Sequence, residues 1–285
     1  MGLVLGGAMF HAIWNLLVRR GRHPDVFAWL LGVAAAVVYV PLGAYRFSTI
    51  GLPSEGLPFV AATITIHAVY FITLGRAYSR GDLSLVYPIA RGIGPTLVPF
   101  LAVPFLGETI SLVGGIGIAA VILGVVSLQA GGLGPGAARR FGASFRHPAA
   151  IYAVITGVLI AMYSTVDRAG VRYVDPVLYG YTIFLGAPAL SGLYYVSRRR
   201  REIVECWQSN GVSIVVAGTL SPLSYFMALA AFRMGQVSYL APLREVSIVF
   251  AAVLGVVVLR ERFSPARLAS AGITTAGVAL IGFGA

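Results

Sequence analysis

The sequence contains no lysine, a single cysteine and few charged residues of either sign. Charged residues make up 11% of the 285 residues, whereas a soluble domain carries roughly 25%. The lone Cys206 excludes a disulfide within the chain and a metal site built from cysteines. The four histidines and ten acidic residues show no catalytic or metal-ligand spacing. We therefore expect neither an enzyme nor a bound cofactor or metal.

Motifs for phosphate and nucleotide binding are also missing. Without a Walker motif, this chain alone cannot drive transport with ATP. The segment "GIGIAA" at 115–120 resembles a dinucleotide fingerprint, but it lies in an uncharged run with no strand before it. Its small residues instead favour close helix packing, as do Gly272 and Ala276. The formal charge of +11 does not indicate nucleic acid, because the arginines flank apolar runs.

Long apolar runs fill most of the chain, which is 58% hydrophobic with a mean hydropathy of +0.86. A helix needs about 20 apolar residues to cross a bilayer. Such runs predict an all-α integral membrane protein with ten transmembrane helices, multi-pass in the cell (inner) membrane. The predicted spans are 2–18, 27–45, 57–75, 83–105, 110–128, 148–166, 176–197, 211–232, 236–259 and 266–284.

The arginines are divided unequally between the two sets of loops. Loops after the odd-numbered spans hold 15 of the 21 arginines and loops after the even-numbered spans hold 4. The positive-inside rule then places the odd-numbered loops in the cytoplasm and both termini outside. The arginine run at 198–201 serves as an orientation anchor beside anionic lipid.

The two halves of the chain resemble each other. "AYSRGDLSLVYPIAR" (77–91) aligns without a gap with "AFRMGQVSYLAPLRE" (231–245), and "GETIS" (107–111) aligns after a one-residue slip with "RERFS" (260–264). The halves are 1–130 and 148–285, joined by a loop at 131–147. Five spans per half require opposite orientations, which is the inverted repeat of many secondary transporters.

Several segments resemble the EamA branch of the drug/metabolite transporter superfamily. They are "HAIWN", "RAYSRGDLSLVYPIARG", "FLGETIS" and "PLREVSIVFAAVLGVVVLRERFSP". The resemblance covers the whole chain as two EamA-type repeats and implies transport of small metabolites such as amino acids through a central cavity. Better-known ten-helix members keep both termini in the cytoplasm, and the arginine distribution here predicts the opposite orientation.

Three charged residues lie inside predicted spans. Arg91 lies about eight residues into span 4, and Arg244 and Glu245 lie about as far into span 9, which places all three near the bilayer midplane. Intramembrane charges face the bundle interior or a wet cavity. We expect Arg91 to line a central cavity, and a structural salt bridge with Glu245 is the alternative. If Arg91 pairs with Glu245, Arg244 remains without a partner in span 9, and its planar guanidinium suits a carboxylate or phosphonate.

Polar and aromatic residues at helical spacing predict the rest of a cavity lining. These substrate-binding candidates are His11, Trp14, Asn15, His67, Tyr70, Tyr87 and Tyr163, besides Arg91, Arg244 and Glu245. Asp167, four residues after Tyr163, lies near a helix end, where pairing with Arg168 or Arg172 is the alternative to a cavity role. By contrast, Trp29, Tyr39, Tyr45 and Trp207 lie near span ends, which is typical of interface aromatics.

Proton coupling and gating also have candidates. Glu245 is the first candidate for a proton carrier, followed by His67 and His11 and lastly Asp167. Pro88 and Pro242 each precede an intramembrane arginine and loosen the helix, which favours gating; a merely kinked helix is the alternative.

Two functions fit this sequence. The first is a secondary transporter of a small polar metabolite, an amino acid or another carboxylate- or phosphonate-bearing solute, working by alternating access. The second is a lipid-handling membrane protein, a flippase, scramblase or intramembrane enzyme, in which Arg91 and Arg244 hold a lipid phosphate. The expected partners are a small-molecule substrate, the lipid bilayer and a coupling proton or other ion. The sequence leaves monomer and homodimer equally open.

Overall fold

The structure is a computed structural model that describes residues 2–20, 23–81, 83–129, 136, 139, 142–143, 145–250, 253 and 265–284. All regular elements among these residues are helices. They are α1 (Gly2–Arg20), α2 (Pro24–Val38), α3 (Val40–Ile50), the short 3-10 helix η1 (Ser54–Gly56), α4 (Leu57–Tyr78), α5 (Leu83–Leu106), α6 (Leu112–Gln129), α8 (Ala149–Gly170), α9 (Pro176–Arg198), α10 (Arg200–Met234), α11 (Val237–Arg244) and α13 (Pro265–Gly284).

Five of these helices are long and apolar enough to cross a membrane: α4 with η1, α5 from Ile89, α8, α9 and α10. The pair α2 and α3 passes the same test as one span bent by 55°, which gives up to six among the described residues. Shorter apolar helices cover Gly2–Val18, Leu112–Leu128 and Leu268–Gly284. A multi-pass membrane protein is therefore supported, and the count of ten transmembrane helices stays a prediction.

The bend between α2 and α3 has a chemical cause. Pro41 begins α3 within its first turn and has no backbone N–H to bond the carbonyl four residues earlier. The helix therefore stops at Tyr39, which breaks the predicted span 27–45 into two pieces. The Tyr39 hydroxyl donates a 2.7 Å hydrogen bond to the carbonyl of Thr219 on α10, which fastens the bend to the bundle.

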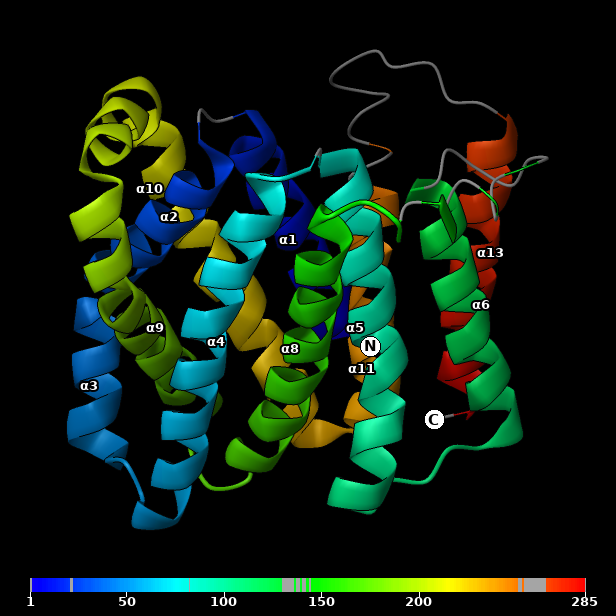
Figure 1. The fold of residues 1–285 in the computed structure, drawn as a ribbon. Coiled ribbons are helices and arrows are strands. Elements are labelled where there is room, and N and C mark those ends of the chain that lie inside the picture. Colours follow the sequence, from blue (N-terminus) through cyan, green and yellow to red (C-terminus); the bar gives the residue numbers. More distant parts are fainter. Residues whose placement is uncertain are drawn as a thin grey trace.

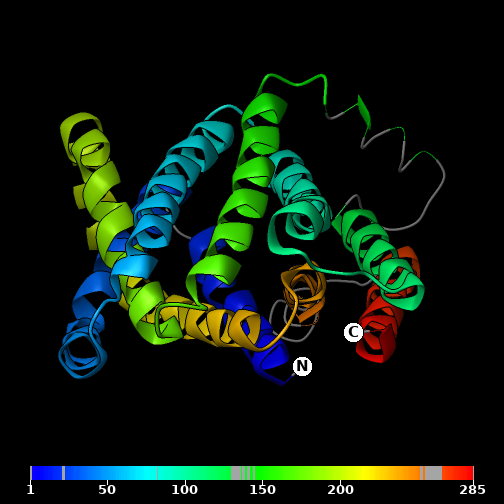
Figure 2. The same ribbon diagram turned by 90° about the horizontal axis from the view of Figure 1, so that it is seen from below.

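The helices form two rows that face each other, as Figure 2 shows from below. One row contains α4, α8 and α5, and the other contains α10, α1 and α11, while α6 and α13 pair at one edge. Contacts between helices come in matched pairs: α4 packs on α8 as α1 packs on α10, and α4 packs on α9 as α2 packs on α10. The central space between the rows is where the polar residues gather.

The α6–α13 pair is close because both helices have glycine at the crossing. A Cβ atom on Gly117 would lie 2.8 Å from the backbone nitrogen of Ile281 and 2.9 Å from the carbonyl oxygen of Gly277. The close helix packing predicted for the small residues of this segment is therefore found at Gly117. The same prediction for Gly272 was wrong, because a Cβ atom there would have no atom within 4 Å.

The aromatic residues predicted at span ends divide into two groups. Tyr45 and Trp207 are about half exposed or more, as an interface position requires. The expectation for Trp29 was wrong, because its side chain is buried and stacks on Tyr195 with ring centroids 5.3 Å apart. Its indole N–H donates to the carbonyl of Pro188 at 3.1 Å. Pro188 lies within α9, so this hydrogen bond joins α2 to α9.

Candidate functional site

A cavity of about 120 Å³ lies between the two rows of helices. Its walls come from both halves of the chain, and its polar lining includes residues far apart in the sequence. Eight of the predicted site residues line it: His11, Trp14, Asn15, His67, Tyr70, Arg91, Tyr163 and Arg244. Sequence reasoning missed four further polar lining residues: Asp25, Ser221, Ser224 and Tyr225.

Arg91 lies in the cavity wall and makes an ion pair there. Its Nε atom is 3.0 Å from Oε2 of Glu245, and Nη2 is 3.2 Å from Nε2 of His11. Because a guanidinium only donates, His11 Nε2 accepts and the ring carries its proton on Nδ1. Glu245 is buried behind Arg91 and does not line the cavity. The sequence analysis gave a place in the cavity lining and a salt bridge with Glu245 as alternatives. In the structure Arg91 lines the cavity and also forms the salt bridge.

Arg244, the neighbour of Glu245, faces the cavity with a different environment. Its guanidinium carbon lies 5.3 Å from the ring centroid of Tyr225 and 5.7 Å from that of Phe232. Among the described residues, none forms an ion pair with Arg244 at 4.0 Å or less. Within the described part of the chain, the charge of Arg91 is paired with Glu245, whereas Arg244 has no carboxylate within ion-pair distance.

The backbone break in α11 explains how Arg244 and Glu245 reach different places. The helix contains Pro242 and ends at Arg244, Glu245 stands in a turn, and residues 246–250 are helical again. The turn is closed by the Glu245 N–H donating to the carbonyl of Pro242 at 3.0 Å. By comparison, α5 runs without a break from Leu83 to Leu106, through position 88. Residues 251–252 and 254–259 of the predicted ninth span lie outside the described residues.

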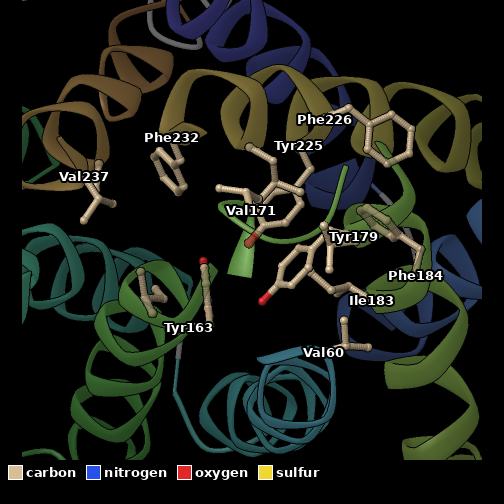
Figure 3. Packing of buried hydrophobic residues seen from close by; sticks show 14 of the residues in the cluster. Val60, Tyr163, Val171, Tyr179, Ile183, Phe184, Tyr225, Phe226, Phe232 and Val237 are labelled. Carbon is tan, nitrogen blue, oxygen red and sulfur yellow. The ribbon is translucent and has the colours of Figure 1, made fainter. Parts of the chain in front are cut away.

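A second polar cluster lies below the cavity, toward the end of α8. Asp167 is fully buried and accepts hydrogen bonds from Thr63 (2.6 Å), Tyr179 (3.0 Å) and the Tyr225 hydroxyl. Figure 3 shows the hydroxyls of Tyr163, Tyr179 and Tyr225 directed toward a common centre from three helices. The pairing of Asp167 with Arg168 or Arg172, one of the two alternatives for this residue, is not found among the described residues; Arg168 instead lies 3.6 Å from Glu108.

His67 connects this cluster to the cavity. Its Nδ1 atom lies 2.9 Å from the carbonyl oxygen of Thr63, one turn earlier on α4, and Nε2 lies 3.5 Å from the Tyr225 hydroxyl. The imidazole stacks on Tyr163 with centroids 4.2 Å apart. His67, Tyr163 and Tyr225 line the cavity, whereas Asp167 lies behind them. We call His67, Tyr163 and Tyr225 the floor of the cavity.

The two ends of the bundle differ in how they are closed. Near the arginine-rich end, Asp25 lines the cavity and pairs with Arg199 at 2.9 Å. Near the opposite end, the Glu108 carboxylate accepts from the backbone N–H groups of Val237 and Ser238 at 2.8 and 2.9 Å. The cavity lining reaches Val18, Pro24 and Gly75 at the arginine-rich end, and it does not include Glu108.

The sequence contained a signal for part of what was missed. Thr63 and His67 are four residues apart on α4, the same spacing that identified the other pairs. Ser221 and Tyr225 on α10 have the same spacing. Tyr179 had no such signal, because a tyrosine in an apolar helix is as common in packing as in binding. The side chains of two predicted residues, Tyr87 and Pro88, lie outside the described part of the structure.

Comparisons with known proteins give one family and one fold. The model of the EamA-like transporter family matches residues 147–283. A crystal structure titled only as that of a protein is similar over 99% of this chain and 96% of its own, with a TM-score of 0.79 and 18% identity. At this identity the likeness concerns the fold alone. No curated protein matches the sequence. Residues 147–283 therefore carry the EamA-like transporter pattern, which agrees with the family predicted from the sequence for the second of the two repeats.

Proposed function

We propose that this protein is a secondary transporter that moves a small solute with a carboxylate or phosphonate group by alternating access between its two halves. The family match indicates a membrane transporter. The observation that carries the finer proposal is Arg244 in the cavity lining with no carboxylate within 4.0 Å among the described residues. A planar guanidinium binds a carboxylate or phosphonate through two parallel hydrogen bonds, so an anionic group is the ligand that it recognises best.

The cavity also limits the size and kind of solute. Its volume of about 120 Å³ is well below the roughly 300–1,000 Å³ of pockets for drug-sized ligands. Asn15, Ser221 and Ser224 offer amide and hydroxyl groups, and Tyr70 and Phe184 offer aromatic faces. A small solute with one anionic group and an uncharged polar or apolar remainder fits this lining.

The arrangement of the helices supports alternating access between halves. Under the predicted repeat, α1 corresponds to α8, α2 with α3 to α9, and α4 to α10. Under this correspondence the contact α4–α8 in one half is equivalent to α10–α1 in the other, and α4–α9 is equivalent to α10–α2. Such a pseudo-two-fold arrangement has two equivalent states, in which the cavity opens to one side or the other of the membrane.

Uptake into proteoliposomes tests the proposal. The purified protein would be offered a panel of radiolabelled L-amino acids, dicarboxylates and alkyl phosphonates. We expect saturable uptake of at least one anionic group of solutes. Arg244→Gln should reduce it by about tenfold or more, because a hydrogen bond to a charged group contributes about 1.5–3 kcal/mol.

The matched control is Arg233→Gln, which removes an arginine that is exposed near the end of α10. It should leave uptake unchanged. Equal uptake by wild type and Arg244→Gln would contradict the assignment of Arg244. Fluorescent phospholipid, included in the same vesicles, addresses the lipid-handling alternative: rapid exposure of the label on the opposite leaflet, with no uptake of any solute, would overturn the proposal.

A further inference from the structure

We propose that His67, Tyr225 and Asp167 form a proton-binding unit in the floor of the cavity, in which His67 Nε2 takes up the coupling proton and Asp167 balances its charge. The inference rests on the proposed transport function, because it assigns the site of energy coupling. It gives the first role to His67 and Asp167 in place of Glu245, which is held by Arg91.

The hydrogen bonds fix where the neutral His67 ring carries its proton. Nδ1 lies 2.9 Å from the carbonyl oxygen of Thr63. A carbonyl oxygen only accepts, and the Thr63 hydroxyl, 3.1 Å from Nδ1, already donates its hydrogen to Asp167. Nδ1 therefore donates to these oxygens and carries the proton of the neutral ring. Nε2 is then left with a lone pair, and this lone pair faces the Tyr225 hydroxyl oxygen at 3.5 Å.

The Tyr225 hydroxyl has no proton to offer Nε2, because it donates its only hydrogen to Oδ2 of Asp167. In the neutral state two acceptors therefore face each other. A proton on Nε2 supplies the missing donor, and the chain from Nε2–H through the Tyr225 hydroxyl to the Asp167 carboxylate becomes continuous. The proton comes from hydronium in the cavity: an N–H bond forms, an O–H bond of hydronium breaks, and water remains.

Three hydroxyls surround Asp167 and stabilise its carboxylate form. Thr63, Tyr179 and Tyr225 each have a hydroxyl within reach of its two oxygens. All three hydroxyls can donate to the carboxylate, and an imidazolium at His67 finds its counter-charge one hydroxyl away. A buried charge pair of this kind is tolerated only with such hydrogen bonds.

Other groups face this unit from each neighbouring helix. Tyr163 comes from α8 and Tyr179 from α9. Arg244 comes from α11, with its guanidinium over the Tyr225 ring, and the Arg91–Glu245 pair lies on the cavity wall with no net charge. The charge of Arg244 opposes a second positive charge at His67. An anionic solute on Arg244 removes this opposition, so proton and anion favour each other's binding by linkage and are carried in the same direction.

The test needs no substrate, since the probe is the proton. The full chain, labelled with nitrogen-15 at its four histidines, would be placed in lipid nanodiscs and its ring signals followed from about pH 9 to about pH 5, the range in which histidine changes charge. His67→Gln identifies the signal. We expect the His67 ring to pass from the Nδ1–H form to the doubly protonated form in the wild type. In Asp167→Asn and in Tyr225→Phe it should remain neutral at pH values at which the wild-type ring is charged.

Tyr195→Phe is the matched control, because it removes the same hydroxyl from a buried tyrosine that does not line the cavity. It should behave as the wild type. A His67 ring that stays neutral throughout, or that charges equally in wild type, Tyr225→Phe and Asp167→Asn, would overturn the proposal. The readout holds whether or not the solute panel is transported, so this failure is distinguishable from failure of the proposed function.

A second readout tests coupling itself. Proteoliposomes with a trapped pH dye should acidify inside when a transported anion of the panel is added outside. His67→Gln should lose the acidification and keep exchange of labelled for unlabelled solute. Acidification of wild-type magnitude in His67→Gln vesicles would place the proton elsewhere.

Discussion

At the level of single residues, the cavity combines one balanced and one unbalanced arginine. Arg91 is held by Glu245 and by His11, whereas Arg244 has aromatic rings as neighbours. These two arginines have different consequences for stability and for function. Removing a charge from the balanced pair leaves the other buried and uncompensated, which is costly. Removing the charge of Arg244 affects what the cavity attracts.

This difference predicts the stability of the Arg91–Glu245 pair. Glu245→Ala should lower the free energy of unfolding by about 3–5 kcal/mol, because it leaves a buried guanidinium without its counter-charge. The double variant Arg91→Met/Glu245→Leu should recover most of that loss, since neither charge remains. Thermal unfolding of the purified protein in detergent measures both.

Glu205→Ala is the control for this pair. It breaks the Arg201–Glu205 pair, in which the arginine side chain is 92% exposed, and should leave the unfolding temperature unchanged. A double variant no more stable than Glu245→Ala alone would show that the pair contributes through something other than its charges.

Sequence alone could predict those site residues that are rare in apolar runs. A charge or a histidine inside a membrane run stands out, so Arg91, Arg244, Glu245, His11 and His67 were found. Hydroxyl groups do not stand out, and the donors to Asp167 were missed. Asp167 itself was ranked last as a coupling group because it lies near the end of its span, a position that says nothing of the three hydroxyls contributed by α4, α9 and α10.

At the level of elements, hydropathy located the helices well and their ends less well. Each predicted span overlaps a helix, but α10 begins at Arg200, eleven residues before the predicted start at 211. The polar first turns of α10 are stabilised by pairs such as Arg199 with Glu202 and Arg201 with Glu205, three and four residues apart. A scan for apolar runs cannot detect such a segment. The bend at Tyr39 was missed because Pro41 lies within an uncharged apolar run, and a scan for such runs does not detect a missing backbone N–H.

Glu108 holds the start of α11 at the end of the bundle opposite the arginine-rich loops. Its carboxylate satisfies two of the backbone donors that every helix leaves unpaired at its first turn. The negative charge also suits the positive end of the helix dipole. Because α11 carries Arg244, this contact joins the closed end of the bundle to the cavity.

We predict that Glu108→Ala loosens this end specifically. Hydrogen exchange at Val237 and Ser238 should become faster by about 10- to 100-fold, because each hydrogen bond to a charged group contributes about 1.5–3 kcal/mol. Exchange measured by mass spectrometry in detergent or nanodiscs reports this directly, and α9 should be unaffected.

Asp175→Ala gives the reciprocal comparison. Asp175 caps α9 through the N–H groups of Val177 and Leu178 at 3.2 and 3.1 Å. Its loss should speed exchange there and leave the first turn of α11 at wild-type rates. Faster exchange in both places from either variant would mean that the end of the bundle opens as one unit, and that Glu108 has no separate role.

At the level of the whole molecule, the cavity and the arginines together assign a direction to the structure. The cavity lining reaches the ends of α1 and α4 and the start of α2, where the arginine-rich loops lie. Glu108 and the Asp167 cluster close the opposite end, which also holds the C-terminal end of α13, since the Ser111 hydroxyl donates to the carbonyl of Gly284. If the positive-inside rule applies to this chain, the state described is open toward the cytoplasm and both termini face outward.

Labelling from each side of the membrane tests this orientation. Cys206 is the only native cysteine and is buried, so a Cys206→Ser background allows single new cysteines. Leu74→Cys at the cavity mouth should react with a membrane-impermeant thiol reagent in inside-out vesicles and be protected in whole cells. Glu55→Cys, in the exposed turn η1 between α3 and α4 at the other end, should show the reverse.

The physical reason for this expectation is the excess of arginine in the odd-numbered loops, 15 against 4. Translocating each extra positive charge against the membrane potential is unfavourable. The opposite labelling pattern would place both termini in the cytoplasm, as in better-known ten-helix members, and would make the described state outward-open.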